Sequence, residues 1–378
     1  MNNLRGSSSA VRTDLIIVGA GIVGLAHAYE AHRKGYTVRV IERDARPNGA
    51  SVRNFGHCCI TAQDGELLET AYRSREGWLS AAKDVGFWAP PAGAYVVARS
   101  EAEMTVIEDL NGKRGSEAVS LMTAEAVKAT LGGTPDPTIV GGAHLPADLR
   151  VDPRSAPGEI ADWLQNQKGV DIEWTTNVLG IGDGTVATSR GDFHACKVLV
   201  CVGHDMDHLY PELATRYQVQ RSALQMALAP APSTYKLDAA VLTGTSMTRY
   251  DGFTAMPGAA AVKEEIYAQS PELIDMVANV MFARRPDGTV ILGDSHVYGT
   301  TIAPFQDEWW TTRLVDEIAK IIGAPLKVTQ RWQGVYASSP LTSLLVEDVD
   351  PKTRVITVTS GIGMTISFGI AAKTVEGL

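Results

Sequence analysis

The stretch that decides the fold is DLIIVGAGIVGLAHAYEAHRKGYTVRVIER, residues 14 to 43. Its apolar run Leu15 to Val18 has the length and β-branched content of a buried parallel strand, and it ends at a G-x-G-x-x-G sequence, residues 19 to 24. Apolar side chains then recur at helical spacing as far as Gly35, a predicted helix C-cap, and a second buried strand follows from Tyr36 to Ile41. The stretch therefore predicts a β-turn-α-β unit.

Each glycine of this turn has a physical role in binding a dinucleotide. Gly19 permits the tight turn, Gly21 lets the backbone approach a pyrophosphate, and Gly24 lets the helix pack close to the strand. The free N–H groups and the dipole at the helix N-terminus favour the phosphates. Glu42 is placed to accept hydrogen bonds from the ribose hydroxyls of an adenosine, and its charge disfavours a 2′-phosphate. This motif alone does not distinguish NAD from FAD.

The bulk properties describe an ordinary globular chain of about two domains. Its 378 residues are too many for one simple core, and its 45% hydrophobic and 20% charged content is usual for a globular protein. The formal net charge of -9 argues against nucleic acid or an anionic membrane as the main partner. The sequence has no apolar run of about twenty residues, so we expect no membrane span, and residues 1–12 are expected to form a flexible leader.

Four cysteines bear on metal binding and on the redox setting. No C-x-x-C pair or metal-ligand spacing links them, so we expect no metal site and a reduced, cytoplasmic protein. They are Cys58, Cys59, Cys196 and Cys201.

A loop of small and polar residues, 44–65, follows the second predicted strand. Ser51 and Arg53 are candidates for contacts with phosphate oxygens, and Asn54 for contacts with a ring edge or a ribose. The alternative is an ordinary polar surface loop. Its place directly after the nucleotide-binding unit favours the functional interpretation.

The order of the remaining elements predicts one domain interrupted by another. A helix that starts with Asp152 as N-cap and Pro153 at its first position, and a buried strand that closes on Gly203, return the chain to the first sheet. The segments 216–230 and 240–256 are expected to be antiparallel strands of the second domain. We therefore predict an α/β fold, with a discontinuous Rossmann-like domain at 13–86, 145–215 and 326–378, and an inserted α+β domain, built on an antiparallel sheet, at 87–144 and 216–325.

A second glycine turn lies near the C-terminus. A buried strand, residues 354–359, ends in the sequence SGIGMT, residues 360–365, and a helix is predicted from Ile366 to Val375. This turn offers a second set of backbone N–H groups to a ligand, which suggests a cofactor with a second polar part. The alternative is a close crossing of helix and strand.

Taken together, these motifs resemble the FAD-dependent glycine oxidase, sarcosine oxidase and D-amino-acid oxidase family over essentially the whole chain. The resemblance implies a split FAD-binding domain, with the antiparallel sheet of the inserted domain lying over the flavin ring. It also implies that the backbone of Val178 holds the adenine and that the C-terminal turn lies by the pyrimidine end of the flavin. The cofactor residues that it implies are Gly19, Gly21, Ile22, Val23, Gly24, Glu42, Arg43, Ser51, Arg53, Asn54, Gly56, His57, Val178, Gly203, Gly361, Gly363, Met364 and Thr365.

Two segments, 53–57 and 248–253, give a finer resemblance. They are most similar to a bacterial branch of the family that is proposed to oxidise aminophosphonates. Some sarcosine oxidases attach FAD to a cysteine near the segment that corresponds here to 332–336, and no cysteine occurs in it. Non-covalent FAD is therefore expected, with His57 as an alternative attachment point.

A small anionic amine needs a cationic clamp in the substrate site, and arginine provides the better fork. The alternatives are a surface or ion-paired arginine, a structural histidine and packed tyrosines. The candidates for contacts with the substrate are Arg249 with Tyr250 beside it, Arg331, His296, Tyr298 and Tyr336.

The chemistry implied by the resemblance asks little acid–base work of the protein. A neutral amine passes a hydride from its α-carbon to the flavin N5, and the imine hydrolyses to a carbonyl compound and an amine or ammonia. The electrons then go to O2, giving H2O2, or to another acceptor. An NAD-dependent dehydrogenase and a non-enzymatic nucleotide sensor are the alternatives, and the oligomeric state stays open.

Overall fold

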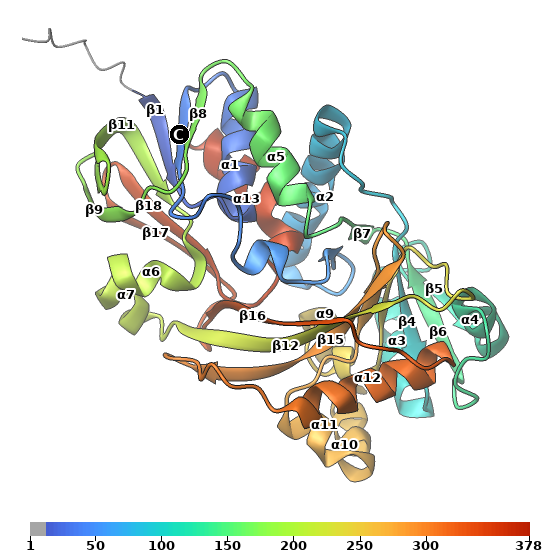
Figure 1. The fold of residues 1–378 in the computed structure, drawn as a ribbon. Coiled ribbons are helices and arrows are strands. Elements are labelled where there is room, and N and C mark those ends of the chain that lie inside the picture. The colour runs from blue at the N-terminus through green and yellow to red at the C-terminus, as the bar shows by residue number, and fades with distance from the viewer. Residues whose placement is uncertain (1–12) are drawn as a thin grey trace, which may run out of the picture.

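Two eight-stranded sheets form the framework of the protein (Figure 1). The computed structural model describes residues 13–378, so the predicted leader, residues 1–12, lies outside the described part of the chain. One sheet is mainly parallel and Rossmann-like, and the other is mainly antiparallel. The predicted α/β fold class is confirmed.

The first sheet grows outward from the N-terminal unit. β1 pairs in parallel with β2 on one side and with β11 on the other, whereas β17 runs antiparallel to β18 and the side strands β9 and β10 pair antiparallel with each other and with β11. Its strands are, in spatial order, β17 (Leu344–Asp350), β18 (Thr353–Val358), β11 (Gly191–Val200), β1 (Thr13–Val18), β2 (Val38–Ile41) and β8 (Val170–Glu173), with the side strands β9 (Val178–Gly182) and β10 (Thr185–Thr188) next to β11.

Helices α1 (Ile22–Arg33) and α13 (Gly363–Glu376) pack together beside this sheet, although they come from opposite ends of the chain (Figure 1). α2 (Gly65–Val85) packs against α13, where the buried Trp78 donates a hydrogen bond of 2.7 Å to the carbonyl of Met364. α5 (Ala156–Gln165) packs against α1 and β8. Packing of these apolar faces brings the two glycine turns to the same edge of the sheet.

The second sheet is dominated by two 11-residue strands, β12 and β15. All its pairings are antiparallel except that of β13 with β4. Its strands are, in spatial order, β16 (Gln330–Ser338), β12 (Gln220–Pro230), β15 (Thr289–Gly299), β14 (Phe282–Arg284), β13 (Ala240–Leu242), β4 (Ala94–Ala98), β6 (Gly141–Leu145) and β5 (Ser120–Thr123).

The remaining elements flank the second sheet or connect the two sheets. α12 packs against β12 and β15, and α10 packs against α3 and α11. These elements are the helices α3 (Glu101–Arg114), α4 (Ala124–Leu131), α6 (Met206–Leu209), α7 (Pro211–Arg216), α8 (Gly244–Met247), α9 (Asp251–Thr254), α10 (Ala259–Gln269), α11 (Pro271–Asp275) and α12 (Glu308–Ile322), the short helical turns η1 (Ala50–Val52) and η2 (Gly203–Asp205), and the two-stranded pair β3 (His57–Cys58) and β7 (Leu149–Arg150).

Two predicted elements differ from the structure. The segment 240–256 is not a long antiparallel strand, because Thr243 forms a capping box with Ser246 and turns the chain into α8 and α9 after the short β13. The predicted N-cap at Asp152 is also wrong, since α5 begins at Ala156. The Asp152 carboxylate instead pairs with Arg285 at 2.9 Å.

The sheet membership bears on the domain boundaries. β16 pairs with β12 along its whole length, so residues 330–338 extend the second sheet. We propose that the first domain resumes after Ser338 rather than at residue 326. The other predicted boundaries remain part of the same proposal.

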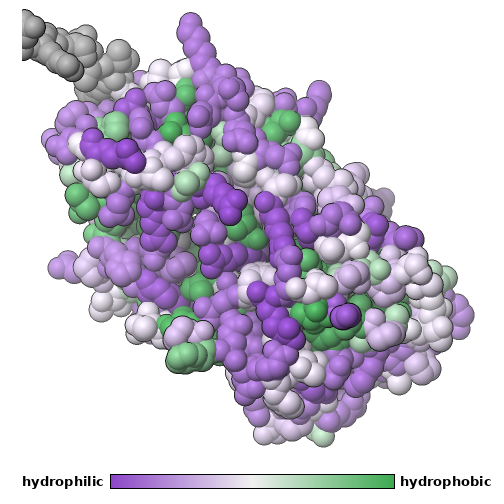
Figure 2. Space-filling view, in the orientation of Figure 1, coloured by the Kyte–Doolittle hydropathy of each residue, from purple (hydrophilic) through white to green (hydrophobic). Residues whose placement is uncertain are grey.

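The helices and one face of the surface can be compared with what a membrane span requires. No helix within 13–378 is long and apolar enough to span a bilayer. The face shown in Figure 2 is mainly hydrophilic, with hydrophobic side chains exposed in separate patches.

Candidate active site

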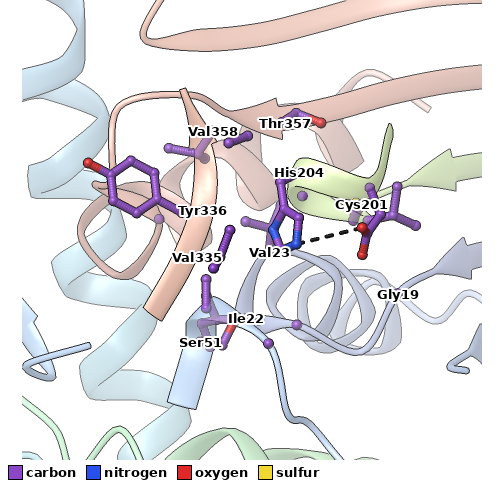
Figure 3. Close-up of a pocket in the computed structure, with 18 of the residues that line it drawn as sticks. Gly19, Ile22, Val23, Ser51, Cys201, His204, Val335, Tyr336, Thr357 and Val358 are labelled. Atoms are coloured by element: carbon purple, nitrogen blue, oxygen red, sulfur yellow. Dashed lines mark hydrogen bonds and ion pairs between the residues drawn. The ribbon is translucent and has the colours of Figure 1, made fainter. Parts of the chain in front are cut away.

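A cavity of about 580 Å³ lies where the two sheets meet. One side is formed by the carboxyl ends of β1, β2 and β11 and by the starts of α1 and α13, and the other by residues of β12, β15 and β16. The edge beyond the carboxyl ends of parallel strands is where open α/β sheets bind their ligands. Figure 3 shows Ile22 and Ser51 at one end of the pocket and Tyr336 and Val358 at another.

The glycine turn before α1 places at the cavity a helix N-terminus that its own N-cap residue does not cap. Gly19 has a φ of 103°, and a Cβ atom there would lie 2.6 Å from the carbonyl oxygen of Cys201. A Cβ on Gly24 would lie 2.0 Å from the carbonyl oxygen of Gly19. The N-cap Gly21 provides no side-chain acceptor, and the first turn of α1 carries no acidic residue. An anion can therefore approach the free N–H groups of this helix.

Side chains from outside the turn hold its backbone in place. The Glu42 carboxylate accepts hydrogen bonds from the N–H of Ala20 at 2.7 Å and from the N–H of Asp44 at 2.9 Å. The Ser51 hydroxyl accepts from the N–H of Ile22 at 2.8 Å. A carboxylate that keeps free lone pairs at the end of β2 is suited to ribose hydroxyls.

Asn54 organises the loop around Ser51. Its amide donates 2.9 Å hydrogen bonds to the carbonyls of Ala50 and Ser51, and its oxygen accepts from the N–H of Gly56 at 2.7 Å. Its polar atoms are thus engaged within the loop, although the residue lines the cavity. The adjacent Arg53 also lines the cavity.

The turn before α13 presents a second helix N-terminus of this kind. Gly361 has a φ of 76°, and a Cβ there would lie 2.9 Å from the ring of Tyr336. The N-cap Ile362 makes no side-chain hydrogen bond, and the first turn of α13 carries no acidic residue. Two helix N-termini therefore face one cavity, which fits a ligand with a diphosphate and a second polar end.

The opposite side of the cavity holds a half-buried arginine and a buried histidine. One Arg249 nitrogen lies 2.8 Å from His296 Nε2, and His296 Nδ1 lies 2.9 Å from the carbonyl oxygen of Val277. Because a carbonyl only accepts, Nδ1 carries the imidazole proton and Nε2 accepts from the guanidinium. His296 is therefore neutral, and burial together with the Arg249 charge holds its pKa well below the usual range.

Asp294 lies on the same strand as His296, two residues earlier. The residue is 4% exposed and lines the cavity. Burial raises the pKa of this carboxyl to about 7, against the opposing effect of the Arg249 charge. Tyr250 and Tyr336 stay protonated nearby, because burial raises both pKa values, that of Tyr336 to about 12.

Most of the residues predicted from the sequence meet at this cavity. Those that line it are Gly19, Gly21, Ile22, Val23, Glu42, Arg43, Ser51, Arg53, Asn54, Val178, Gly203, Arg249, Tyr250, His296, Tyr336, Gly361, Gly363 and Met364.

Six predicted residues do not line the cavity. Arg331 lies at the surface and pairs with Glu308, so it is not placed to hold a ligand there. The other five lie outside the lining, where each makes a contact with a neighbouring residue. Gly24 packs on Gly19, and Gly56 packs on Val151. The Thr365 hydroxyl accepts from the N–H of Cys59, Tyr298 stacks beside His296, and His57 bonds to Asp148.

His57 belongs to a buried polar group below the cavity. His57, Cys59 and Asp148 place ligand-type atoms within 4.8 Å of one another. These atoms already have other roles: His57 Nε2 lies 2.8 Å from one oxygen of Asp148, and the other oxygen accepts from the N–H groups of Ile60 and Thr61. Burial raises the pKa of the Cys59 thiol well above its usual range, which disfavours the thiolate that a metal requires. The group is accounted for as a structural network.

Sequence reasoning missed many lining residues, among them the polar Asp294, Asn279 and His204. A signal for Asp294 was present, because a carboxylate interrupts the apolar strand that runs from Val290 to Leu292. Asn279 and His204 lie in loop and turn segments with no comparable pattern.

Known proteins with this fold include several amino-acid-related enzymes. L-proline dehydrogenase from P. horikoshii is 18% identical, with 97% of this chain and 93% of that chain covered and a TM-score of 0.77. Glycine oxidase from Bacillus cereus ATCC 14579 is 16% identical, with 97% and 95% covered and a TM-score of 0.77. Iminodiacetate oxidase from Chelativorans sp. BNC1 is 17% identical, with 96% and 95% covered and a TM-score of 0.73.

At these identities, the structural likeness establishes the shared fold. No curated protein matches the sequence. The family model described as "DAO: FAD dependent oxidoreductase" matches residues 14–376, almost the whole chain. This match decides between FAD and NAD in favour of FAD, and the two helix N-termini and glycine turns fit that cofactor. The chain belongs to the DAO family of FAD-dependent oxidoreductases, and it is an oxidase or dehydrogenase.

Proposed function

We propose that this enzyme oxidises the C–N bond of a small anionic amine, with FAD bound non-covalently. The substrate class comprises aminophosphonates, N-methylated amines and amino acids. The observation that carries the proposal is Arg249, which lines the cavity yet forms no ion pair within the described residues. A half-buried guanidinium without an ionic partner is suited to a carboxylate or a phosphonate.

The cofactor residues divide along the cavity. The start of α1 and Ser51 would hold the diphosphate, Glu42 the ribose and the backbone of Val178 the adenine, while the start of α13 would lie by the pyrimidine end of the flavin. When bound, FAD supplies the hydride acceptor of the reaction. This chain's own task is to position the amine C–H and to keep water away.

The substrate side of the cavity is suited to that task. Tyr250 and Tyr336 contribute aromatic rings whose hydroxyl groups stay protonated, and Leu224 contributes an apolar side chain. Neutral His296 fixes the guanidinium of Arg249 through its Nε2 lone pair. The site therefore combines one oriented cation and the Asp294 carboxyl with apolar and aromatic walls.

The names of the structural relatives support an amine or amino acid as the substrate class. The aminophosphonate option rests on the segments 53–57 and 248–253. The latter contains Arg249, which contributes to the substrate side of the cavity. The product would be an imine that hydrolyses to a carbonyl compound and an amine or ammonia, with H2O2 if O2 is the acceptor.

Non-covalent FAD is supported by the cysteine and histidine positions. Cys201 is the one cysteine among the described lining residues, and burial raises the pKa of its thiol to about 12. His57 is engaged with Asp148 outside the lining. We expect acid precipitation to release all the flavin.

The free thiols also support a cytoplasmic location, because no disulfide forms within residues 13–378.

The test is an anaerobic reduction assay. The purified yellow protein is mixed with glycine, sarcosine, D-amino acids, 2-aminoethylphosphonate, and the N-methyl and hydroxy derivatives of that phosphonate. Bleaching of the flavin absorbance by an anionic amine, but not by its des-amino analogue, is the expected result. A flavin that no amine bleaches, in a protein with full FAD content, would contradict the proposal.

A further inference from the structure

Asp294 is a buried carboxyl group that lines the substrate part of the cavity. Its side chain is 6% exposed, its fully buried Oδ1 has no partner within hydrogen-bond distance and angle, and Asn279 lies close enough to lower the pKa of the carboxyl. The closest ionic neighbour, His296 Nε2, lies 3.9 Å away from Oδ2. That nitrogen carries no proton, because it accepts from Arg249. A desolvated carboxyl oxygen without a donor is costly unless a ligand supplies one.

The strand is shaped around this residue. Between Gln225 and Ala227, β12 advances two residues while β15 advances three, from Ser295 to Leu292, so β15 carries a β-bulge beside Asp294. Bulges re-aim side chains next to active sites. The neighbouring Gly293 has no room for a side chain, because a Cβ there would lie 2.4 Å from the ring of Phe55. The backbone therefore fixes Asp294 among the cavity residues.

The cavity thus offers two opposite charges that do not pair with each other. Arg249 and Asp294 both line it, and no ion pair within 4.0 Å joins them or binds Arg249 to any other described carboxylate. Neutral His296 stands beside both groups. A zwitterion whose anion lies on Arg249 and whose ammonium lies on Asp294 satisfies both charges at once.

We propose that Asp294 binds the ammonium group of the substrate and takes one proton from it. This inference rests on the proposed amine oxidation and deepens it. In the step, one N–H bond of R–CH2–NH3⁺ breaks and an O–H bond forms on the carboxylate, giving R–CH2–NH2 and a neutral carboxylic acid. No electrons are transferred. The freed nitrogen lone pair is what the loss of hydride from the α-carbon requires.

Asp294 is the group here that can titrate near neutral pH. The ionisable groups facing it are Arg249, His296, Tyr250 and Tyr336. The pKa of Arg249 is raised despite burial, those of the two tyrosines are raised mainly by burial, and that of His296 is lowered mainly by burial. With glycine and acetate, whose carboxylates stay ionised throughout, the titration of Asp294 is expected to change the preference for the ammonium between about pH 5.5 and 8.5.

The experiment measures binding without turnover, by anaerobic calorimetry on dithionite-reduced holoenzyme. The probes are two pairs, glycine with acetate and 2-aminoethylphosphonate with ethylphosphonate, and the pair is used whose amine bleaches the oxidised flavin faster. We expect the wild-type protein to bind the amine at least about tenfold tighter than its des-amino analogue, and Asp294→Asn to reduce this preference below about threefold. The analogue itself should bind the variant as tightly as the wild type.

The outcomes separate this inference from the proposed function. If an amine bleaches the flavin but Asp294→Asn keeps the full preference, the role of Asp294 is wrong. If no amine bleaches the wild-type flavin, the proposed function is wrong as well. Should the variant lose its flavin, the wild type alone decides: its preference for the amine must fall at least about fivefold from pH 8.5 to pH 5.5, and a constant preference overturns the inference.

Discussion

The two sides of the cavity treat their polar groups in opposite ways. The cofactor side, defined by residues 19–24, Glu42 and Ser51, ties its side chains to backbone N–H groups. The substrate side, defined by Arg249, Asp294 and His296, keeps a cation and a carboxyl apart without ionic partners. Backbone geometry therefore sets the constant part of the site, and a few desolvated side chains set its specificity.

The largest effect is expected on the cofactor side, from Gly24→Ala. The added Cβ would lie 2.0 Å from the carbonyl oxygen of Gly19, which forces α1 away from β1. We expect a loss of most bound FAD and a destabilisation of about 3 kcal/mol. Flavin absorbance per protein and thermal unfolding measure the two effects.

Gly158→Ala is the matched control. Gly158 lies in α5, and a Cβ there meets nothing within 4 Å. This variant should keep its FAD and gain about 0.5 kcal/mol from helix propensity. Equal FAD content in the two variants would show that the close helix–strand contact is dispensable.

The next effect is expected on the substrate side, from Arg249→Ala. Removing the guanidinium leaves the substrate anion without its charged donor, which raises the KM for the best amine by between about 10- and 100-fold. FAD content should change little, because Arg249 contacts His296, Val277 and Tyr298 on the substrate side. Steady-state kinetics and the flavin spectrum measure both quantities.

Arg331→Ala sharpens this comparison between two arginines. Arg331 was a sequence candidate for the same clamp, but it lies at the surface and pairs with Glu308. An exposed pair contributes little, so KM should stay within about twofold of the wild-type value. A large increase for Arg331→Ala together with a small one for Arg249→Ala would reverse the assignment.

The sequence predicted the cofactor side better than the substrate side, for a physical reason. Residues 19–24 and Glu42 lie within one local β-α-β unit, so their spacing alone determines where they meet. Gly361 and Gly363 join them because α13 packs on α1, and a strand–turn–helix pattern announces such a site.

The substrate side depends on long-range pairing that no local pattern records. Asp294 reaches the cavity through a bulge between β12 and β15, and Arg249 reaches it from a turn that the sequence pattern predicted as part of a strand. Spacing cannot reveal which of two arginines faces inward when their elements are placed by distant partners. Arg249 and Arg331 show both outcomes.

A third, smaller effect concerns stability and pH. Burial raises the pKa of Asp294 to about 7 in the folded protein, above its unfolded value. The folded state therefore keeps a proton that the unfolded state has released, and the stability contribution of this group falls as pH rises through this window. The free energy of unfolding of Asp294→Asn, measured relative to that of the wild type, should therefore rise by about 2 kcal/mol as pH goes from 5 to 8. The Tm difference between the two proteins should rise by a few degrees over the same range.

Asp287→Asn provides the opposite sign as a control. The pKa of Asp287 is lowered on balance: its partial burial acts in the raising direction, but hydrogen bonds to Thr289 and the charge of Arg285 outweigh it. This group adds stability above its unfolded pKa and loses it as pH falls. The Asp287→Asn variant should therefore lose stability relative to the wild type at pH 8. A parallel response of both variants to pH would contradict the assigned environment of Asp294.

The smallest effect tests the backbone contacts of the cofactor side, with Ser51→Ala. The substitution removes the acceptor that the N–H of Ile22 uses at 2.8 Å. One neutral hydrogen bond contributes about 1 kcal/mol, so the Kd of FAD for the apoprotein should rise about fivefold. Ser120→Ala, in β5 of the second sheet, is the matched control and should leave the Kd unchanged. Fluorescence titration of apoprotein with FAD measures both values. If the Kd of the Ser51→Ala variant were unchanged, water or the diphosphate would have replaced the Ser51 hydroxyl as acceptor, which requires that the N–H of Ile22 be accessible. That result would mean that the N-terminus of α1, rather than the loop around Ser51, holds the cofactor.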